Sequence, residues 1–170
     1  IPATTQKSSK SPIIYAISGQ IVDNRKDYIP IMESFQRIHN KLKRKSELHF
    51  IGRFNCSAVL KQQLLSFSKK TRCKNFKVVF YDNQIPPKGI LGEHIFNQAV
   101  ANCDVLLSAQ GTNALKVFKG YQEYFGSSSA SGLSFDAIRF SKPVVLGASH
   151  EYLQDIKAGV DIYKSPKQLD

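Results

Sequence analysis

The stretch GSSSASGLSFDAIRF, at residues 126–140, combines three features that suit the binding of a phosphate group. Small hydroxyl residues lead into a predicted amphipathic helix, and Ser131 is placed to cap the start of that helix. Gly132 lets a ligand approach the backbone N–H groups of the first turn, which favour an anion. Asp136 lies one turn further on, where a carboxylate suits sugar hydroxyls. A plain linker followed by an ordinary N-cap is the alternative interpretation.

A second loop, SGQIVDNRK, follows the first predicted strand. Gly19 permits close approach of a ligand to the backbone, and Arg25 and Lys26 place two cations at the start of the next helix. Because a cation there opposes the helix dipole, the pair favours a nearby anion. The alternative is two solvated charges that are offset by Asp23 and Asp27.

A third loop, YDNQIPP, could present backbone groups of Tyr81 and Asn83 to a planar base, although this signal is weak on its own. The dinucleotide motif GxGxxG and the phosphate-loop motif GxxxxGK(S/T) are absent from the sequence. So are GxSxG, HExxH and CxxC, and the four histidines are scattered. We therefore predict no metal site and assign no catalytic residue.

Strands and helices alternate along the chain. Strands are predicted at residues 13–18, 48–51, 76–81, 105–108 and 143–146, with a sixth at 161–163, and helices at 27–43, 57–70, 93–102 and 132–140. This alternation predicts an α/β fold, a Rossmann-like doubly wound parallel sheet in a single domain. Ligands of such sheets bind at the carboxyl ends of the strands, where all three loops fall. Residues 109–129 form a longer polar segment without a predicted element.

Composition adds a strongly basic charge. The 170 residues are 42% hydrophobic, enough for one globular domain, and carry a formal net charge of +11. The basic clusters, at residues 41–45, 69–70 and 72–74, fall at predicted helix ends. They are either solvated helix termini or a surface for an anionic membrane. Because no aromatic residues are interleaved with them, we predict no nucleic-acid partner.

The cysteines and the first residues of the chain bear on the cellular compartment and on the domain boundaries. Three cysteines without a close pair favour free thiols in a reducing compartment, and hence a cytoplasmic protein that is peripheral to the membrane at most. No apolar stretch is long enough to span a membrane, and we see no signal peptide. Residues 1–12 are predicted to be a linker from a missing N-terminal domain, and residues 13–170 the domain itself.

The order of these motifs resembles a known family. A strand with SGQ and RK, a strand that ends in IG, then VVFYDN, CDVLLS and SG…DA…KPVV resemble the C-terminal domain of GT-B glycosyltransferases, most closely family 4. The resemblance runs from about residue 13 to residue 163. It implies the donor-binding half of an enzyme of polysaccharide biosynthesis. The donor would be a UDP- or GDP-linked sugar, with no other cofactor, and the missing domain would hold a saccharide or lipid-linked acceptor.

The resemblance also implies roles for single residues. In the family, a Gly-Arg pair and a Lys bind the diphosphate. Gly19 matches the glycine, Gln20 stands in place of the arginine, and Arg25 or Lys26 matches the lysine. The residues predicted to bind the donor are Gly19, Gln20, Arg25, Lys26, Tyr81, Asn83, Ser128, Ser131, Gly132, Leu133 and Asp136.

The later motif departs from the family pattern in three places. Asp136 matches the acidic residue that holds the ribose, as Asp instead of Glu. Ser128 stands where the family has a second Glu, so the Glu-x7-Glu motif of retaining enzymes is absent, and Ser141 stands where glycine is usual. A non-catalytic nucleotide- or protein-binding module, or an enzyme similar to nucleotide-sugar epimerases, is the alternative.

Overall fold

The computed structural model describes residues 11–23, 27–41, 44–71, 75–82, 91–109, 115–118, 121–124, 132–147 and 160–163. Most of the predicted linker therefore lies outside the described residues. The strands of the main sheet are β1 (Ile13–Ser18), β2 (Ser46–Ile51), β3 (Phe76–Phe80), β4 (Val105–Leu107), β7 (Val144–Gly147) and β8 (Val160–Tyr163). The helices are α1 (Tyr28–Lys41), α2 (Ala58–Lys70), α3 (Glu93–Asn102) and α4 (Gly132–Phe140).

The six strands form one parallel sheet in the order β3-β2-β1-β4-β7-β8. The predicted doubly wound α/β fold is therefore confirmed, including its sixth strand. The chain builds outward from β1 to β3 and then returns to place β4 on the other side of β1. The strand order thus reverses between β1 and β4, and ligands of such sheets bind at the carboxyl end of this switch point.

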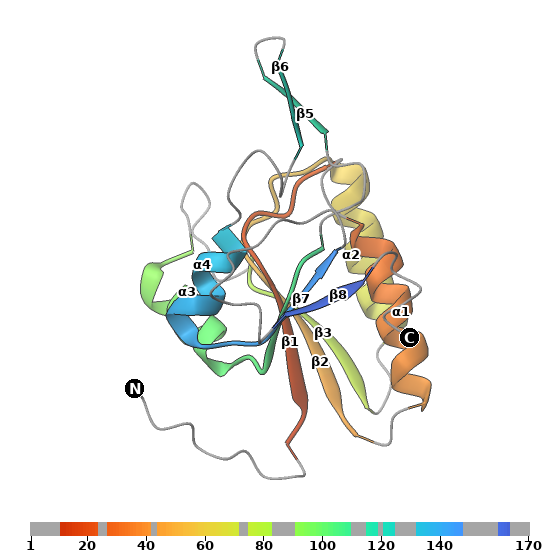
Figure 1. Ribbon diagram of the computed structural model, residues 1–170. Coiled ribbons are helices and arrows are strands. Elements are labelled where there is room, and N and C mark those ends of the chain that lie inside the picture. The colour runs from red at the N-terminus through yellow and green to blue at the C-terminus, as the bar shows by residue number, and fades with distance from the viewer. Residues whose placement is uncertain are drawn as a thin grey trace.

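The two faces of the sheet are covered by different helix pairs. Figure 1 shows α1 and α2 against one face and α3 and α4 against the other. Ile17 packs in the core with Met32 and Leu64, whereas its neighbour Ala16 packs with Val100 on the opposite face. Successive strand side chains point to opposite faces, and both faces are buried, so the strands are apolar almost throughout.

The strands at the centre of the sheet differ in how many residues they pair. β1 pairs with β2 through six residue pairs, from Ile13 opposite Ser46 to Ser18 opposite Ile51. Only two residue pairs join β1 to β4, and two join β4 to β7. Since β4 has three residues, it limits the pairing on both of its sides.

A hairpin was not predicted from the sequence. β5 (Leu115–Phe118) and β6 (Tyr121–Tyr124) pair antiparallel within the polar segment 109–129. They form a separate two-stranded sheet that stands beyond the carboxyl edge of the main sheet, at the top of Figure 1. Four-residue strands give too short a pattern to separate from a loop when the segment around them is polar.

The backbone conformation at the end of α4 shows why glycine is usual in the family at the position of Ser141. Ser141 has a φ of 50°, and its N–H donates to the carbonyl oxygen of Ile138. The N–H of Lys142 donates to the carbonyl oxygen of Ala137. These two bonds form a Schellman motif, whose left-handed residue is most often glycine. Serine adopts that conformation here at a cost in backbone energy.

None of the helices in the described part of the chain combines the length and the hydropathy that crossing a bilayer requires.

Candidate functional site

The carboxyl end of β1 is tied to α4 by two polar side chains. The Oγ of Ser18, the last residue of β1, donates to the Oδ2 of Asp136 at 3.0 Å. Leu133 and Ala137 bury one side of α4 in the core, and this packing brings Asp136 to the end of the strand. Asp136 therefore lies at the switch point of the sheet, at the position where a donor sugar nucleotide is expected.

Burial governs the charge of this carboxyl group. Desolvation raises the pKa of Asp136 above its ordinary value, and the hydrogen bond from Ser18 and the charge of Arg139 oppose that rise. A half-buried carboxylate with an incomplete set of donors gains when a ligand supplies further hydroxyl or N–H groups.

The start of α4 has open space beside it. Gly132 is exposed, and a Cβ built on it meets no atom within 4 Å. The residue that would cap the helix, Ser131, lies outside the described residues, as do Ser128, Asn83, Arg25 and Lys26. What the structure describes at this helix start thus leaves room for a ligand.

Two glycines bring the loops after β1 and β2 together. Gly19 has a φ of 92°, in the left-handed region, and its N–H donates to the carbonyl oxygen of Ile51 at 3.0 Å. A Cβ on Gly52 would overlap the carbonyl group of Gly19. Both residues are therefore needed as glycines, the first for its backbone conformation and the second for the space it leaves.

Beyond these glycines the two loops continue to pair. Ile21 donates its N–H to the carbonyl of Arg53 and accepts from the N–H of Asn55. The side chain of Gln20 accepts from the Nδ2 of Asn55 at 3.2 Å, so the residue that replaces the family's arginine contacts the neighbouring loop. Its backbone carbonyl lies 3.4 Å from the Oη of Tyr28.

The loop after β1 is also fixed to the start of α2. The two oxygens of Asp23 accept from the backbone N–H and the Oγ of Ser57, at 2.6 and 2.7 Å. Ser57 in turn caps α2, because its Oγ accepts from the N–H of Leu60. The hydrogen bonds from Ser57 lower the pKa of Asp23. Asp23, one of the two carboxylates that could offset Arg25 and Lys26, is thus also bonded to Ser57 and keeps its negative charge.

Tyr81 lies in a different environment from the other candidates. Its Oη is 3.3 Å from the Nδ1 of His49, and the Nε2 of His49 is 2.7 Å from the Oε2 of Glu47. Its backbone N–H donates to the carbonyl of Phe50, and its ring packs against the core on the side of α3 and α4. The hydroxyl of Tyr81 is therefore bonded against the face of the sheet, and the prediction that this loop contacts a base stays a prediction.

The structure brings together some of the predicted residues and separates others. Gly19, Gln20, Gly132 and Asp136 come from loops and a helix start at the carboxyl edge. The side chain of Leu133 is 8% exposed and belongs to the core. Sequence reasoning missed the contact of Ser18 with Asp136, and that of Asp23 with Ser57. Among the described residues no cluster of His, Cys, Asp or Glu could hold a metal ion.

Solved structures share this fold. The C-terminal domain of LpcC, a glycosyl transferase group 1 family protein from Francisella tularensis, matches with a TM-score of 0.57 and 14% sequence identity. The match covers 92% of this chain and 71% of that one. The chain has the fold of a glycosyltransferase C-terminal domain.

WaaG, a glycosyltransferase involved in lipopolysaccharide biosynthesis, shows the same GT-B-type fold. It matches with a TM-score of 0.56 and 17% identity. The match covers 93% of this chain but 36% of the WaaG chain, so this chain spans about a third of that protein. No protein-family model matches the sequence, and the search of curated proteins finds no match.

Proposed function

We propose that this chain is the donor-binding domain of a glycosyltransferase and binds a UDP- or GDP-linked sugar at the carboxyl edge of its sheet. The observation that carries the proposal is the position of Asp136, which is half-buried, hydrogen-bonded to Ser18 at the switch point, and one turn from the open start of α4. In the proposal, Asp136 accepts hydrogen bonds from the ribose. The N–H groups at the start of α4 bind the diphosphate.

The proposed chemistry is transfer of the sugar to an acceptor. As the glycosidic bond breaks, negative charge grows on the leaving diphosphate, and the helix start together with Arg25 and Lys26 stabilises it. A second domain holds the saccharide or lipid-linked acceptor, in the cytoplasm, where free thiols such as Cys56 and Cys103 persist. We therefore expect little or no sugar transfer by this domain alone.

Calorimetric titration with UDP, GDP and ADP tests donor binding. We expect micromolar binding of at least one nucleotide (roughly 8 kcal/mol of binding free energy) and a loss of about tenfold or more in Asp136→Asn, since hydrogen bonds to a charged group contribute about 1.5–3 kcal/mol. Glu33→Gln is the matched control, because Glu33 is an exposed helical carboxylate on α1, which covers the other face of the sheet. Equal losses in the two variants would contradict the assigned role of Asp136.

One observation favours the non-catalytic alternative. Gln20 replaces the arginine of the family, and its side chain bonds Asn55 in the neighbouring loop. Circular dichroism checks that the purified domain is folded. If the folded domain binds none of the three nucleotides, the donor-binding proposal is wrong. A protein-binding module on the same fold then becomes the better interpretation.

A further inference from the structure

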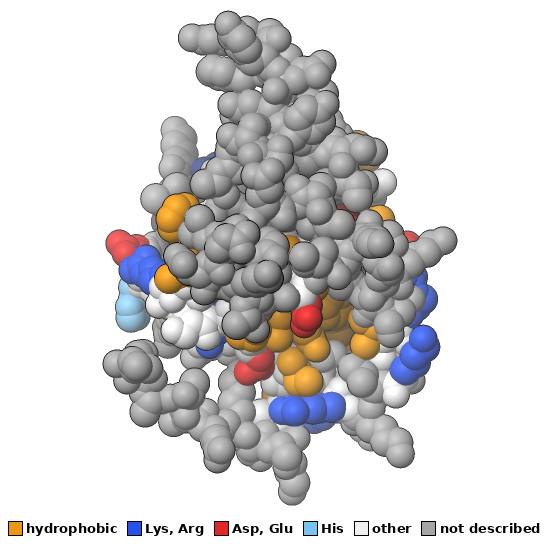
Figure 2. Space-filling view, in the orientation of Figure 1, with side chains coloured by type: hydrophobic (Ala, Val, Ile, Leu, Met, Phe, Trp, Pro, Cys, Tyr) orange, Lys and Arg blue, Asp and Glu red, His pale blue; other side chains and the backbone are white. Residues whose placement is uncertain are grey.

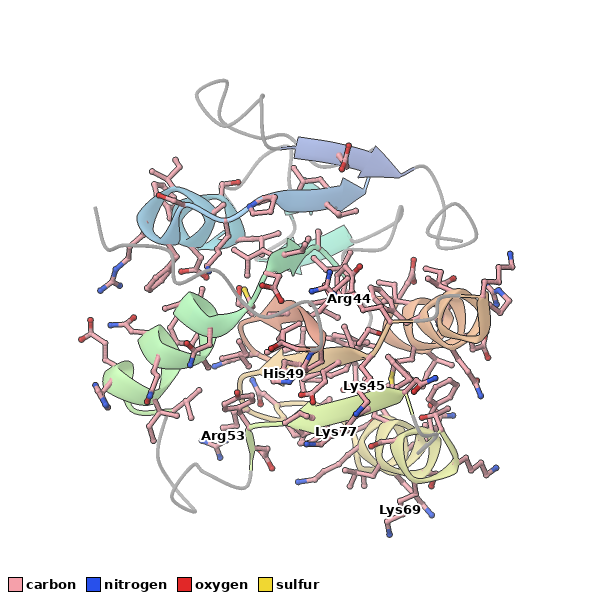
Figure 3. The ribbon with its side chains drawn as sticks, turned by 90° about the horizontal axis from the view of Figure 1, so that it is seen from below. Arg44, Lys45, His49, Arg53, Lys69 and Lys77 are labelled. Carbon is pink, nitrogen blue, oxygen red and sulfur yellow. The ribbon has the colours of Figure 1, made fainter. Side chains whose placement is uncertain are left out.

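The described cations are distributed unevenly between the two edges of the sheet. α1 ends just before β2 and α2 ends just before β3, so the basic clusters at these helix ends lie beside the amino ends of the two strands. Figure 3 looks onto this amino edge from below. We define the amino-edge basic surface by its exposed members: Lys41, Arg44, Lys45, Lys69, Lys70 and Lys77.

The lysines of this surface have no ion-pair partners among the residues that the structure describes. Two cations elsewhere on the domain are paired with acids: the Nζ of Lys61 lies 3.1 Å from Asp82, and the Nη2 of Arg139 lies 3.3 Å from Glu93. Acidic and basic side chains are adjacent in Figure 2 at the margin over α3 and α4. The guanidinium of Arg44 lies 3.5 Å from the carbonyl oxygen of Ser11, a neutral group that does not cancel its charge.

Nearby acidic groups offset part of this charge. Glu47 lies near the start of β2, where its carboxylate is 2.7 Å from the Nε2 of His49. Asp104, just before β4, accepts a hydrogen bond from the backbone N–H of Ile14 at 2.8 Å. Both carboxylates keep their negative charge, but the six cations of the amino-edge basic surface outnumber them, so the net charge there stays positive.

Helix-dipole compensation explains only part of the set. Lys41, Lys69 and Lys70 end helices, where cations complement the terminal carbonyl groups. Lys45 precedes β2 and Lys77 lies within β3, so no helix end accounts for either. In Figure 3, Lys45, Lys77 and Lys69 are labelled on the same side of the sheet, the side of β3.

We propose that the amino-edge basic surface binds the anionic headgroups of a lipid bilayer. Five of its six members are lysines, which act as mobile point charges on long stems and need no fixed partner geometry. A laterally mobile layer of lipid phosphates suits such a set. The surface belongs to the edge opposite the candidate donor site, so the inference goes beyond the proposed function and does not depend on it.

The aromatic residues at this edge argue against single-stranded nucleic acid as the partner. Phe76 is buried, and Tyr15 is half-buried with its ring 4.8 Å from that of Phe35. Neither ring is an exposed platform on which bases could stack. The described part of the edge therefore offers charge without the stacking that such nucleic acids use.

Co-sedimentation with vesicles tests the inference. We expect the domain to bind vesicles of phosphatidylcholine mixed with phosphatidylglycerol, not vesicles of phosphatidylcholine alone, and to be released by salt. The variant Lys45→Gln/Lys70→Gln/Lys77→Gln should partition about 100-fold less, at about fivefold for each cation near the surface. The same three positions changed to arginine should keep the binding, which separates charge from structure.

Two further measurements decide the outcome. Lys77→Gln should weaken vesicle binding about fivefold, whereas Lys61→Gln, which removes the same charge near the start of α2 at the carboxyl edge, should leave it unchanged. Equal effects of the two variants would overturn the proposal, because binding would then follow net charge alone. Equal binding to both kinds of vesicle, or tighter binding to single-stranded RNA at the same ionic strength, would overturn it as well.

Discussion

The hydroxyl of Ser18 and the carboxylate of Asp136 are 118 positions apart in the sequence and 3.0 Å apart in the structure. Their hydrogen bond joins the last residue of β1 to a helix that begins after the hairpin. It is a direct link between the strand at the switch point and α4. The candidate ribose-binding carboxylate is therefore positioned by the strand itself.

Removal of this hydroxyl should affect both stability and ligand binding. Ser18→Ala deletes the donor to a half-buried carboxylate, so we expect the free energy of unfolding to fall by about 1–3 kcal/mol. Chemical denaturation measures this loss. Nucleotide affinity should fall too, because Asp136 loses its orienting partner. In the double variant Ser18→Ala/Asp136→Asn the two losses of stability should not add, and full additivity would show that the hydrogen bond contributes nothing.

Asp136 should give the domain a distinct dependence on pH. Burial raises its pKa in the folded state above the ordinary value of an aspartate, so folding favours the protonated form. Its contribution to stability is then full below the unfolded pKa and is lost as pH rises through the raised folded value. Relative to wild type, Asp136→Asn should become more stable as pH rises from below the unfolded Asp pKa, about 3.9, through the raised folded pKa. Denaturation at several pH values measures the difference, and a difference independent of pH would contradict the assigned burial.

The contact of Gly52 with Gly19 predicts a severe effect of one methyl group. In Gly52→Ala the Cβ meets a backbone carbonyl, which can move only with the loop that carries it. We expect a loss of about 1–3 kcal/mol in unfolding free energy. Gly92→Ala is the matched control, because a Cβ there meets nothing within 4 Å. Thermal unfolding of the two variants should differ clearly, and similar melting temperatures would mean that the loops are not held together.

The left-handed residue after α4 offers a stabilising substitution. Ser141 has a φ of 50°, which glycine adopts without the clash of a Cβ. Ser141→Gly should therefore raise the free energy of unfolding by up to about 1 kcal/mol. Urea denaturation measures the gain. A clear loss of stability instead would show that the Schellman geometry at this helix end is not maintained in solution.

Most of the fold was predictable because hydrophobic periodicity and short connections determine an alternating β/α chain. The bounds of β1, α3 and α4 agree with the sequence prediction, since Gly, Pro or a polar turn follows or precedes each of them. β5 and β6 were missed because four-residue strands carry little pattern. The candidate site was less predictable. Leu133 was placed at the ligand, but its spacing to Ala137 puts both side chains on the buried side of α4.

Long-range contacts explain what sequence reasoning could not supply. A serine at the end of a strand gives no indication that a helix more than a hundred residues later will reach it, as α4 reaches Ser18. Likewise, the sequence showed Asp23 as a charge near two cations, and nothing in it indicated the hydrogen bonds with Ser57 at the start of α2. The pairing of separate loops depends on how the strands are ordered in the sheet, which local patterns do not encode.

The short pairing of β4 has a mechanical consequence. With two residue pairs on each side, β4 joins a well-paired half of the sheet, β3-β2-β1, to the half that contains β7 and β8. We expect amide hydrogens along this seam to exchange with solvent faster than those between β1 and β2, since fewer bonds must break for it to open. Ser18 and Asp136 bridge the same seam, so a nucleotide bound beside them would slow that exchange and act as a clamp across the two halves.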